Sequence, residues 1–241
     1  MTTFHRFVDD YRRVRLAEGY ASADPEFARR LPFSDLTGRN TAAWRIRALH
    51  YLLIRAALAA LPGIDRVLDI GAGNGWLARR LAGSFQVTAL DVDGGDTGLA
   101  AIRDPRVGRV TADLEALPLR AGSFDAVIAA AALHYAVDVG RALAEARRVL
   151  RPGGLLIIAD SPVYAHAAGR EEARERTRAH YAGFGAAHLA ERYRGLTRAE
   201  LDAPGLFRFV TISPGVPWRD RLRPWRGIAG PRLPVLFGWR R

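Results

Sequence analysis

Three glycines on alternate positions, Gly71, Gly73 and Gly75, follow the short apolar run VLDI at residues 67–70. This pattern predicts a strand, a tight turn and the start of a helix. Glycine lets a ligand approach the main chain closely, and the first turn of a helix leaves backbone N–H groups without intrahelical partners. The stretch therefore predicts a binding site for a nucleotide-sized ligand.

A second short apolar run, VTALD, ends at Asp91, which lies 20 residues beyond Gly71. At this spacing a carboxylate can accept hydrogen bonds from the two hydroxyls of a ribose, which indicates a nucleoside. The dinucleotide fingerprint G-x-G-x-x-G needs a small residue at its sixth position, and this chain has Trp76 there. The sequence therefore argues against NAD as the ligand.

Four segments resemble, in order and in spacing, the motifs of class I S-adenosylmethionine-dependent methyltransferases: the two above, TADLEALPLRAGSFDAVIAAAALHY at 111–135 and ARRVLRPGGLLIIAD at 146–160. The resemblance covers about residues 64–160 and implies S-adenosylmethionine (SAM) as the cofactor. It further implies that the glycine loop lies under the methionine and ribose, that the acid ending the second strand holds the ribose, and that the acid after the third strand contacts the adenine. The expected cofactor-binding residues are Asp69, Gly71, Ala72, Gly73, Gly75, Asp91, Val92, Asp113, Leu114 and Ala130.

Two acids beside these motifs have less specific roles. Asp69 is expected to orient the glycine loop through its amides or to cap the helix that follows. Asp93 is expected to be a solvated loop acid and not a second ribose contact.

Methyl transfer from SAM is an in-line displacement, so the protein must align the acceptor with the methyl group and remove a proton from an O–H or N–H acceptor. His134 and Tyr135 follow the fourth predicted strand, at the end of the sheet where ligands bind in this architecture, and are the candidate catalytic residues. His134 is expected to act at the acceptor, as a base or as a residue that orients it. The resemblance has one departure, because Ala129–Ala132 stand where N- and DNA-modifying members carry an asparagine or aspartate. Further candidates for the acceptor pocket are Tyr164, His166, Tyr181, His188 and Tyr193.

Alternating short apolar runs and helical segments from residue 64 onward predict right-handed βαβ units and a parallel sheet. We expect an α/β fold with a doubly wound, Rossmann-like sheet of seven strands, mostly parallel, with an antiparallel last strand. The predicted strands cover 66–70, 86–91, 107–111, 124–130, 154–159, 207–213 and 234–240. The predicted helices cover 4–18, 41–60, 75–82, 96–103 and 138–150, and a charged helix opens the segment 167–194.

The expected organisation is an N-terminal helical lid or extension over residues 1–62 and a methyltransferase domain over 63–241, with a cap insertion at about 161–205. The helix at 41–60 is expected to bury Trp44, Leu49, Leu52, Leu53 and Leu58. It either packs on the sheet edge or covers the cofactor. In the second case Arg45 or Arg47 would reach the methionine carboxylate.

The composition excludes several classes of chemistry. Of the 241 residues 49% are apolar, which permits a sizeable core, and there is no cysteine for a disulfide, a thiolate or a cysteine zinc site. We expect no bound metal. No run of 18 apolar residues and no signal-peptide core is present, so we expect a cytoplasmic protein without a membrane span.

The formal net charge of +11 comes entirely from arginine, because the chain has no lysine. The excess is concentrated in residues 219–241, which hold seven arginines and one acid, with Trp218, Trp225 and Trp239 nearby. Arginines interleaved with tryptophans suit RNA or an anionic membrane surface. We expect a small-molecule acceptor first, with weak membrane-surface association through the C-terminus. A membrane-associated lipid or quinone-like acceptor, RNA, and a SAM-binding protein without catalysis are the alternatives, and the oligomeric state is open.

Overall fold

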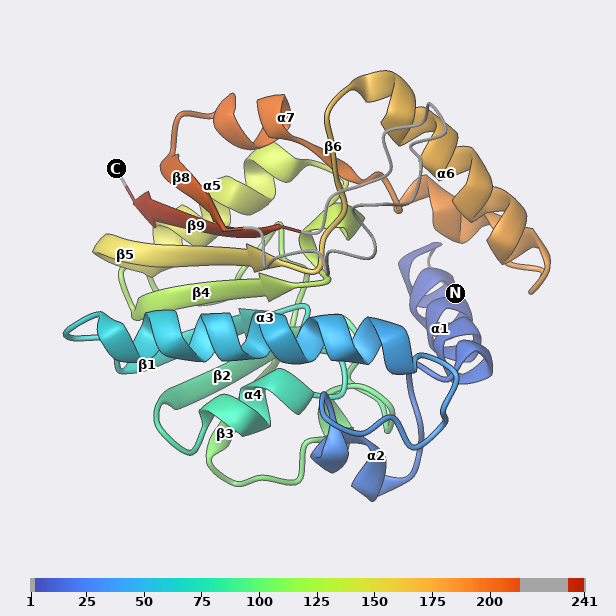
Figure 1. Cartoon of the computed structure of the whole chain (residues 1–241), viewed down its shortest axis with the longest axis horizontal. Coiled ribbons are helices and arrows are strands. Elements are labelled where there is room, and N and C mark those ends of the chain that lie inside the picture. The colour runs from blue at the N-terminus through green and yellow to red at the C-terminus, as the bar shows by residue number, and fades with distance from the viewer. Residues whose placement is uncertain (1–2, 213–233, 241) are drawn as a thin grey trace, which may run out of the picture.

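The structure is a computed structural model and describes residues 3–212 and 234–240. A seven-stranded sheet with the order β3-β2-β1-β4-β5-β9-β8 forms its centre (Figure 1). Neighbours among the first five strands run parallel, whereas β9 is antiparallel to both β5 and β8. The predicted fold class is therefore confirmed. The strands are β1 Arg66–Ile70, β2 Gln86–Asp91, β3 Val107–Thr111, β4 Phe124–Ala130, β5 Leu150–Ala159, β8 Phe207–Ile212 and β9 Val235–Arg240.

Helices cover both faces of the sheet and its carboxyl edge. The helices α3 (Thr41–Ala60) and α4 (Trp76–Leu81) lie on one face, and α5 (Val139–Val149) with α7 (Arg198–Asp202) lies on the other. The helices α1 (Thr3–Glu18) and α6 (Ala167–Ala182) lie beyond the carboxyl ends of β4 and β5 (Figure 1). The shorter elements are α2 Pro25–Arg30, the 3₁₀ turns η1 Leu99–Ala101, η2 Leu133–Tyr135 and η3 Ala187–Glu191, and the strand pair β6 Val163–Tyr164 and β7 Leu196–Thr197.

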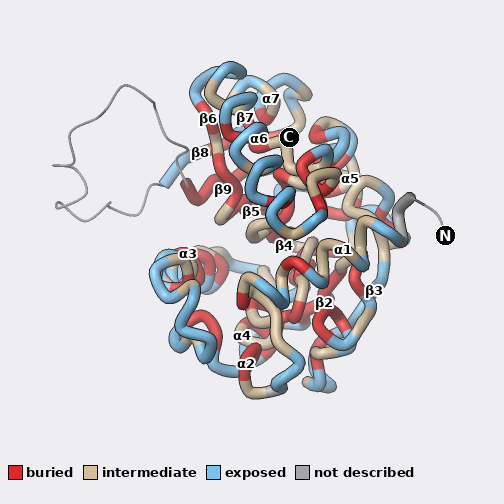
Figure 2. The backbone as a smooth tube through the Cα atoms, turned by 90° about the vertical axis from the view of Figure 1, so that its right-hand side faces the viewer, coloured by how far each residue is buried: buried red, intermediate tan, exposed pale blue. Residues whose placement is uncertain are grey.

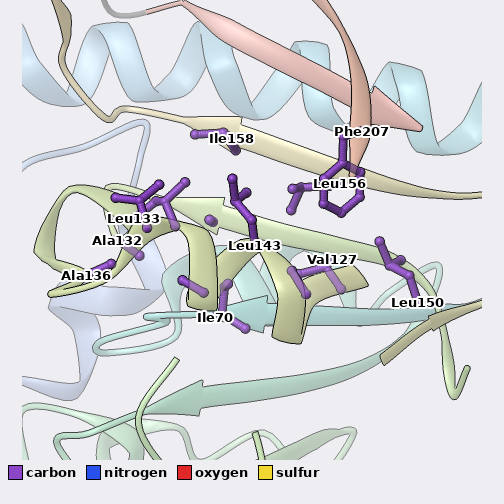
Figure 3. Packing of buried hydrophobic residues seen from close by; sticks show 14 of the residues in the cluster. Ile70, Val127, Ala132, Leu133, Ala136, Leu143, Leu150, Leu156, Ile158 and Phe207 are labelled. Atoms are coloured by element: carbon purple, nitrogen blue, oxygen red, sulfur yellow. The ribbon is translucent and has the colours of Figure 1, made fainter. Parts of the chain in front are cut away.

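Alternation along the central strands builds two separate cores. Val127 and Leu156 face α5 together with Phe207 from β8, as Figure 3 shows. Ile128 and Ile157, one residue further along the same strands, pack toward α3 and α4. Because successive side chains of a strand point to opposite faces, one apolar run fills both cores and fixes the register of the sheet.

The predicted helix at 96–103 is wrong, since this segment forms only the 3₁₀ turn η1. The carbonyl of Asp93 accepts the N–H of Leu99, and the Asp93 side chain accepts the N–H of Gly95. A side chain at Gly98 would lie 2.2 Å from the Asp93 carbonyl oxygen, so the loop is folded tightly back on itself. Pro105 leaves no room for further helical turns before β3.

The buried face of α3 also differs from the prediction. Trp44 and Leu58 are buried as predicted, but Leu49 and Leu52 are 50% and 47% exposed. Tyr51 and Ile54 are buried instead. In Figure 2 the helix is exposed along one side and buried along the other. The buried side of α3 includes aromatic and polar side chains as well as aliphatic ones. The spacing of the leucines alone therefore did not identify which side of the helix is buried.

Candidate functional site

The glycine loop between β1 and α4 has a backbone that other residues would not adopt. Gly71, Gly73 and Gly75 have φ values of +70°, +53° and +70°, in the left-handed region. A Cβ on Gly71 would lie 2.3 Å from Cβ of Ala132, and a Cβ on Gly75 would lie 2.3 Å from Cδ1 of Ile102. Glycine is therefore required at these positions by the positive φ values, and at Gly71 and Gly75 also by the close contacts with Ala132 and Ile102.

Asp91 at the end of β2 holds this loop. Its Oδ2 accepts the N–H of Gly73 at 2.8 Å, and its Oδ1 accepts the N–H of Asp93 at 2.8 Å. Burial raises the pKa of Asp91 above its ordinary value, although these backbone hydrogen bonds act in the opposite direction. Asp91 and Gly73 both line one cavity.

Asp93 is not the solvated acid that the sequence suggested. It is 7% exposed and forms a two-point ion pair with Arg12 of α1, in which Arg12 Nε lies 3.3 Å from Asp93 Oδ2 and Arg12 Nη2 contacts the other oxygen. The pair joins α1 to the loop after β2. Arg12 lies 81 residues away along the chain, so local patterning carries no signal for the pair.

Asp69 lies in β1 beneath the loop, is 1% exposed and does not line the cavity. Within the described residues its Oδ2 has no hydrogen-bond partner. Burial first, and then the charge of Asp91, raise the pKa of Asp69 to about 8, against the opposite effect of a backbone hydrogen bond from Ala78 in the first turn of α4. Asp69 thus sits in the protonated form over much of the neutral range.

Asp69→Asn is expected to gain stability relative to the wild type as the pH rises. The folded-state pKa of Asp69 lies above its unfolded value, so the folded protein binds more protons from about pH 4 to about pH 8, and this contribution to stability is lost as the pH rises. Asparagine mimics the protonated acid and has no such dependence. Urea unfolding at pH 5, 6, 7 and 8 measures the difference in the free energy of unfolding. The exposed variant Asp9→Asn is the control, and a pH-independent difference for Asp69→Asn would contradict the assignment.

A cavity of about 720 Å³ lies at the carboxyl ends of β1, β2, β4 and β5. It brings together seven of the predicted site residues: Gly71, Ala72, Gly73, Asp91, Ala130, His134 and Tyr135. The other five predicted residues do not line it: Asp69, Gly75, Val92, Asp113 and Leu114.

Asp113, the predicted adenine contact, lies in the loop after β3. Its Oδ1 accepts the N–H of Glu115 at 3.0 Å, and its Oδ2 lies 3.8 Å from the guanidinium of Arg192. Leu114 packs at the margin of the core. Val92 is half-buried directly after β2. These three residues lie beside the cavity and do not form its wall.

His134 and Tyr135 form the turn η2 directly after β4. His134 is 5% exposed, and its Nδ1 lies 3.1 Å from Oγ of Ser161. Burial, together with the charges of Arg15 and Arg47, lowers the pKa of His134 to about 3. His134 is therefore a neutral imidazole at neutral pH, suited to accept or donate a hydrogen bond and poorly suited to keep a proton.

The predicted pocket residues divide into two groups. Tyr164, Tyr181 and Tyr193 line the cavity. His166 is exposed and does not line the cavity, and His188 lies 3.3 Å from the carboxylate of Asp10 on α1.

A buried guanidinium on α1 is the largest feature that the sequence reasoning missed. Arg15 Nη2 donates to Oη of Tyr181 at 2.6 Å and to Oη of Tyr135 at 3.2 Å, and its guanidinium lies 4.9 Å from the ring centre of Tyr11. Tyr11 and Arg15 are four residues apart, so they share one helix face. The sequence signal that could have predicted this cluster is an arginine on the aromatic face of an amphipathic helix.

A second buried pair, His50 with Asp160, was also missed. Nδ1 of His50 lies 2.7 Å from Oδ1 of Asp160, and His50 is 1% exposed. Asp160 follows β5 with a φ of +55°, which is uncommon for a residue with a side chain. Since Ser161 comes next and contacts His134, the pair fixes the backbone that supports the imidazole.

The described residues contain neither a cluster of potential metal ligands nor a helix that could span a membrane. Within residues 3–212 and 234–240, no three acidic or histidine side chains are grouped as metal ligands. No helix in the same ranges has the length and apolarity needed to cross a bilayer. The arginine-rich segment at 219–232 lies outside the described residues, so the prediction of membrane association through it stays a prediction.

Comparison with known proteins indicates the class. Residues 68–158 match the family model described as "Methyltransferase domain". The chain is 20% identical to the solved YcgJ protein of Bacillus subtilis, with a TM-score of 0.60 over 80% of this chain and 98% of that one. It is 16% identical to geranyl diphosphate C-methyltransferase of Streptomyces coelicolor, with a TM-score of 0.59 over 82% and 80% of the two chains. Residues 68–158 thus match a methyltransferase domain, which supports the resemblance to class I SAM-dependent methyltransferases, and the solved structures show that the chain shares their fold.

Curated relatives share higher identity over a shorter region. The 27-O-demethylrifamycin SV methyltransferase of Amycolatopsis mediterranei is 37% identical over 131 residues, which are 51% of this chain and 48% of the relative. The demethylmenaquinone methyltransferase of Renibacterium salmoninarum is 38% identical over 122 residues, which are 50% and 48% of the two chains. The chain thus spans about half the length of these relatives.

Proposed function

We propose that this protein transfers a methyl group from SAM to a small-molecule acceptor. The observation that carries the proposal is the joint placement of Gly73 and Asp91, whose amide and carboxylate meet on one wall of the cavity. A carboxylate at the end of β2 suits the ribose hydroxyls, and the glycine turn leaves room for the methionine part. The curated relatives, which methylate small molecules by name, support the same reaction.

The residues present fit such a cofactor. Gly71, Gly73 and Asp91 all line the cavity, and nothing lies within 4 Å of the position of a Cβ on Gly73. SAM would supply a methyl carbon activated by its sulfonium: a lone pair of the acceptor would form the new bond to this carbon as the carbon–sulfur bond breaks and S-adenosylhomocysteine (SAH) leaves. The chain then has to hold the cofactor, align the acceptor beside Ala130 and His134, and exclude water. We infer that the elements in 1–62 serve as a lid and that the cap insertion at about 161–205 forms the acceptor side.

Arg47 is the proposed partner of the methionine carboxylate. Arg47 lines the cavity, whereas Arg45 on the same helix is exposed and does not. Arg47→Ala is therefore expected to weaken binding of SAH by about tenfold or more, because a charge-assisted hydrogen bond is lost. Isothermal titration with SAH measures the effect. Arg45→Ala is the matched control, and equal loss in both variants would remove Arg47 from the site.

His134 is proposed to orient the acceptor. Its pKa of about 3 leaves it neutral, so it acts through hydrogen bonding. His134→Ala is expected to leave the affinity for SAH nearly unchanged and to lower kcat with the methylated acceptor by roughly tenfold to a hundredfold. His166→Ala, an exposed histidine outside the cavity wall, is the control. Lost SAH binding in a folded His134→Ala would place the residue in the cofactor site instead.

The test of the proposed function begins with the cofactor. A ligand that binds only the folded state raises the melting temperature, by several degrees at a hundredfold excess over Kd. SAM and SAH are expected to do so, and NAD is not. Formation of SAH during incubation with a small-molecule acceptor library then separates an enzyme from a SAM-binding protein. A shift with NAD equal to that with SAM would reject the assignment.

We also propose a bacterial origin and a cytoplasmic site of action. The curated relatives named above are bacterial, which supports the first, and a SAM-dependent reaction needs a compartment that supplies the cofactor, which supports the second. A lipid or quinone-like acceptor at a membrane surface is the second candidate. It is favoured by the exposed Ile46, Leu49 and Leu52 on α3, with Arg45 and Arg55 on the same exposed side. Co-sedimentation with anionic vesicles, against the variant Leu49→Gln, tests it.

A further inference from the structure

The guanidinium of Arg15 lies in the cavity on the side of α1 and α6, opposite the glycine loop. Its side chain is 19% exposed, and its Nη2 donates to the hydroxyls of Tyr135 and Tyr181. Rings of Tyr11 and Tyr20 lie 4.9 Å and 5.4 Å from its central carbon. A cation held among aromatic rings and hydroxyls suits a planar or tetrahedral anion.

The hydrogen-bond capacity of this cluster is not used up. Each tyrosine oxygen accepts an N–H from Arg15, and the two oxygens lie 3.4 Å apart, so one hydroxyl can donate to the other. Tyr11 forms a further side-chain hydrogen bond with Tyr135, so the hydroxyls satisfy one another within the cluster. Nε of Arg15 is buried without a hydrogen-bond partner among the described residues. An oxygen of a ligand would satisfy this donor.

Four arginines and four acids of the described residues line the cavity, and the acids are held by specific partners. Each acid of its wall already has a partner: Glu18 with Arg15 at 3.0 Å, Asp91 with two backbone amides, Asp93 with Arg12, and Asp160 with His50. Two arginines of the wall remain. Arg47, with ring contacts to Trp44 and Tyr20, is the proposed partner of the cofactor. Arg176 has a 4.0 Å contact to Glu172, and both of those side chains are more than half exposed, so this pair is weak.

Aromatic rings connect this cluster to the proposed methyl-transfer position. The ring of Tyr135 lies 4.4 Å from that of His134, and the ring of Tyr193 lies 5.1 Å from it. Arg15, Arg176 and Tyr193 all line the cavity, so the two arginines face the same space. A ligand bound at Arg15 would extend along these rings toward His134.

From these observations, and on the basis of the proposed function, we propose that the acceptor carries a carboxylate or phosphate group that Arg15 and the Tyr181 hydroxyl bind. The anion anchors one end of the acceptor beneath α1 and α6. The aromatic walls take its apolar body, and the atom to be methylated lies near His134. The site thereby selects anionic acceptors over neutral ones of the same shape.

The test uses the protein saturated with SAH and three small probes that share a phenyl ring: benzoate, phenyl phosphate and benzyl alcohol. We expect at least one anionic probe to bind in isothermal titration and the neutral alcohol not to bind. A preference for benzoate indicates a carboxylate acceptor, and a preference for phenyl phosphate indicates a phosphate. Arg15→Gln is expected to weaken anion binding by about tenfold or more and to leave SAH binding unchanged. Arg6→Gln, on the same helix with its side chain 74% exposed, should change neither.

Tyr181→Phe keeps the buried ring and removes only the hydroxyl, so it decides the question if Arg15→Gln does not fold. It is expected to weaken anion binding by about threefold to tenfold. Equal binding of the alcohol and the anions, or unchanged anion affinity in Tyr181→Phe and Arg15→Gln, overturns the proposal. Loss of SAH affinity in Arg15→Gln also overturns it, because Arg15 would then belong to the cofactor. If SAH fails to bind the wild type, the proposed function fails, and probe binding without SAH still tests the anion site.

Discussion

Asp91→Ala is expected to weaken the binding of SAH by at least about a hundredfold. Two ribose hydroxyls would donate to the carboxylate, and each hydrogen bond to a charged group contributes about 1.5–3 kcal/mol. The substitution also releases the N–H groups of Gly73 and Asp93, which Asp91 holds at 2.8 Å. The glycine loop is then less well ordered before the ligand arrives. Isothermal titration with SAH, together with the shift in melting temperature, measures the loss.

The control for Asp91→Ala is Asp96→Ala, an exposed acid of the same loop. It should bind SAH as the wild type does. Near-normal SAH affinity in a folded Asp91→Ala would show that the ribose is bound elsewhere, and it would remove the observation on which the proposed function rests.

Gly71→Ala is expected to lower the free energy of unfolding by about 2–5 kcal/mol. The left-handed φ of +70° costs a residue with a Cβ about 1–2 kcal/mol, and the new methyl group would lie 2.3 Å from Cβ of Ala132, an overlap that costs about 1–3 kcal/mol more. Relief of the overlap must move either the glycine loop or the turn after β4. Both line the cavity, so SAH binding should fall as well.

Gly122→Ala separates the two costs. Gly122 has a φ of +65°, and nothing lies within 4 Å of the position of its added Cβ, so only the backbone cost of about 1–2 kcal/mol remains. Urea unfolding of both variants measures the difference. Equal destabilisation by the two substitutions would show that the contact with Ala132 is relieved without cost.

The strands and the glycine loop could be predicted because their signals are local. Buried parallel strands need continuous apolar runs, and the turn after β1 needs glycine where φ is positive. The spacing from Gly71 to Asp91 carried the nucleoside prediction, and the structure places both at one cavity. The predicted helix at 96–103 is wrong because the N–H of Leu99 bonds the Asp93 carbonyl and those of Ala101 and Ile102 bond the carbonyls three residues back, a preference that the apolar residues do not encode.

The remaining parts of the site depend on contacts between distant segments, and only the tertiary structure decided them. Arg12 reaches Asp93 across 81 residues, and Arg15 reaches Tyr181 across 166. The sequence left open whether α3 packs on the sheet or covers the cofactor. Trp44 and Arg47 of α3 line the cavity, and α1, in which no site residue is predicted from the sequence, lines it as well. Local sequence determines which segments form strands and turns, because backbone preferences act over a few residues. Which side chains share a cavity is determined by packing, because burial brings together groups that no spacing along the chain relates.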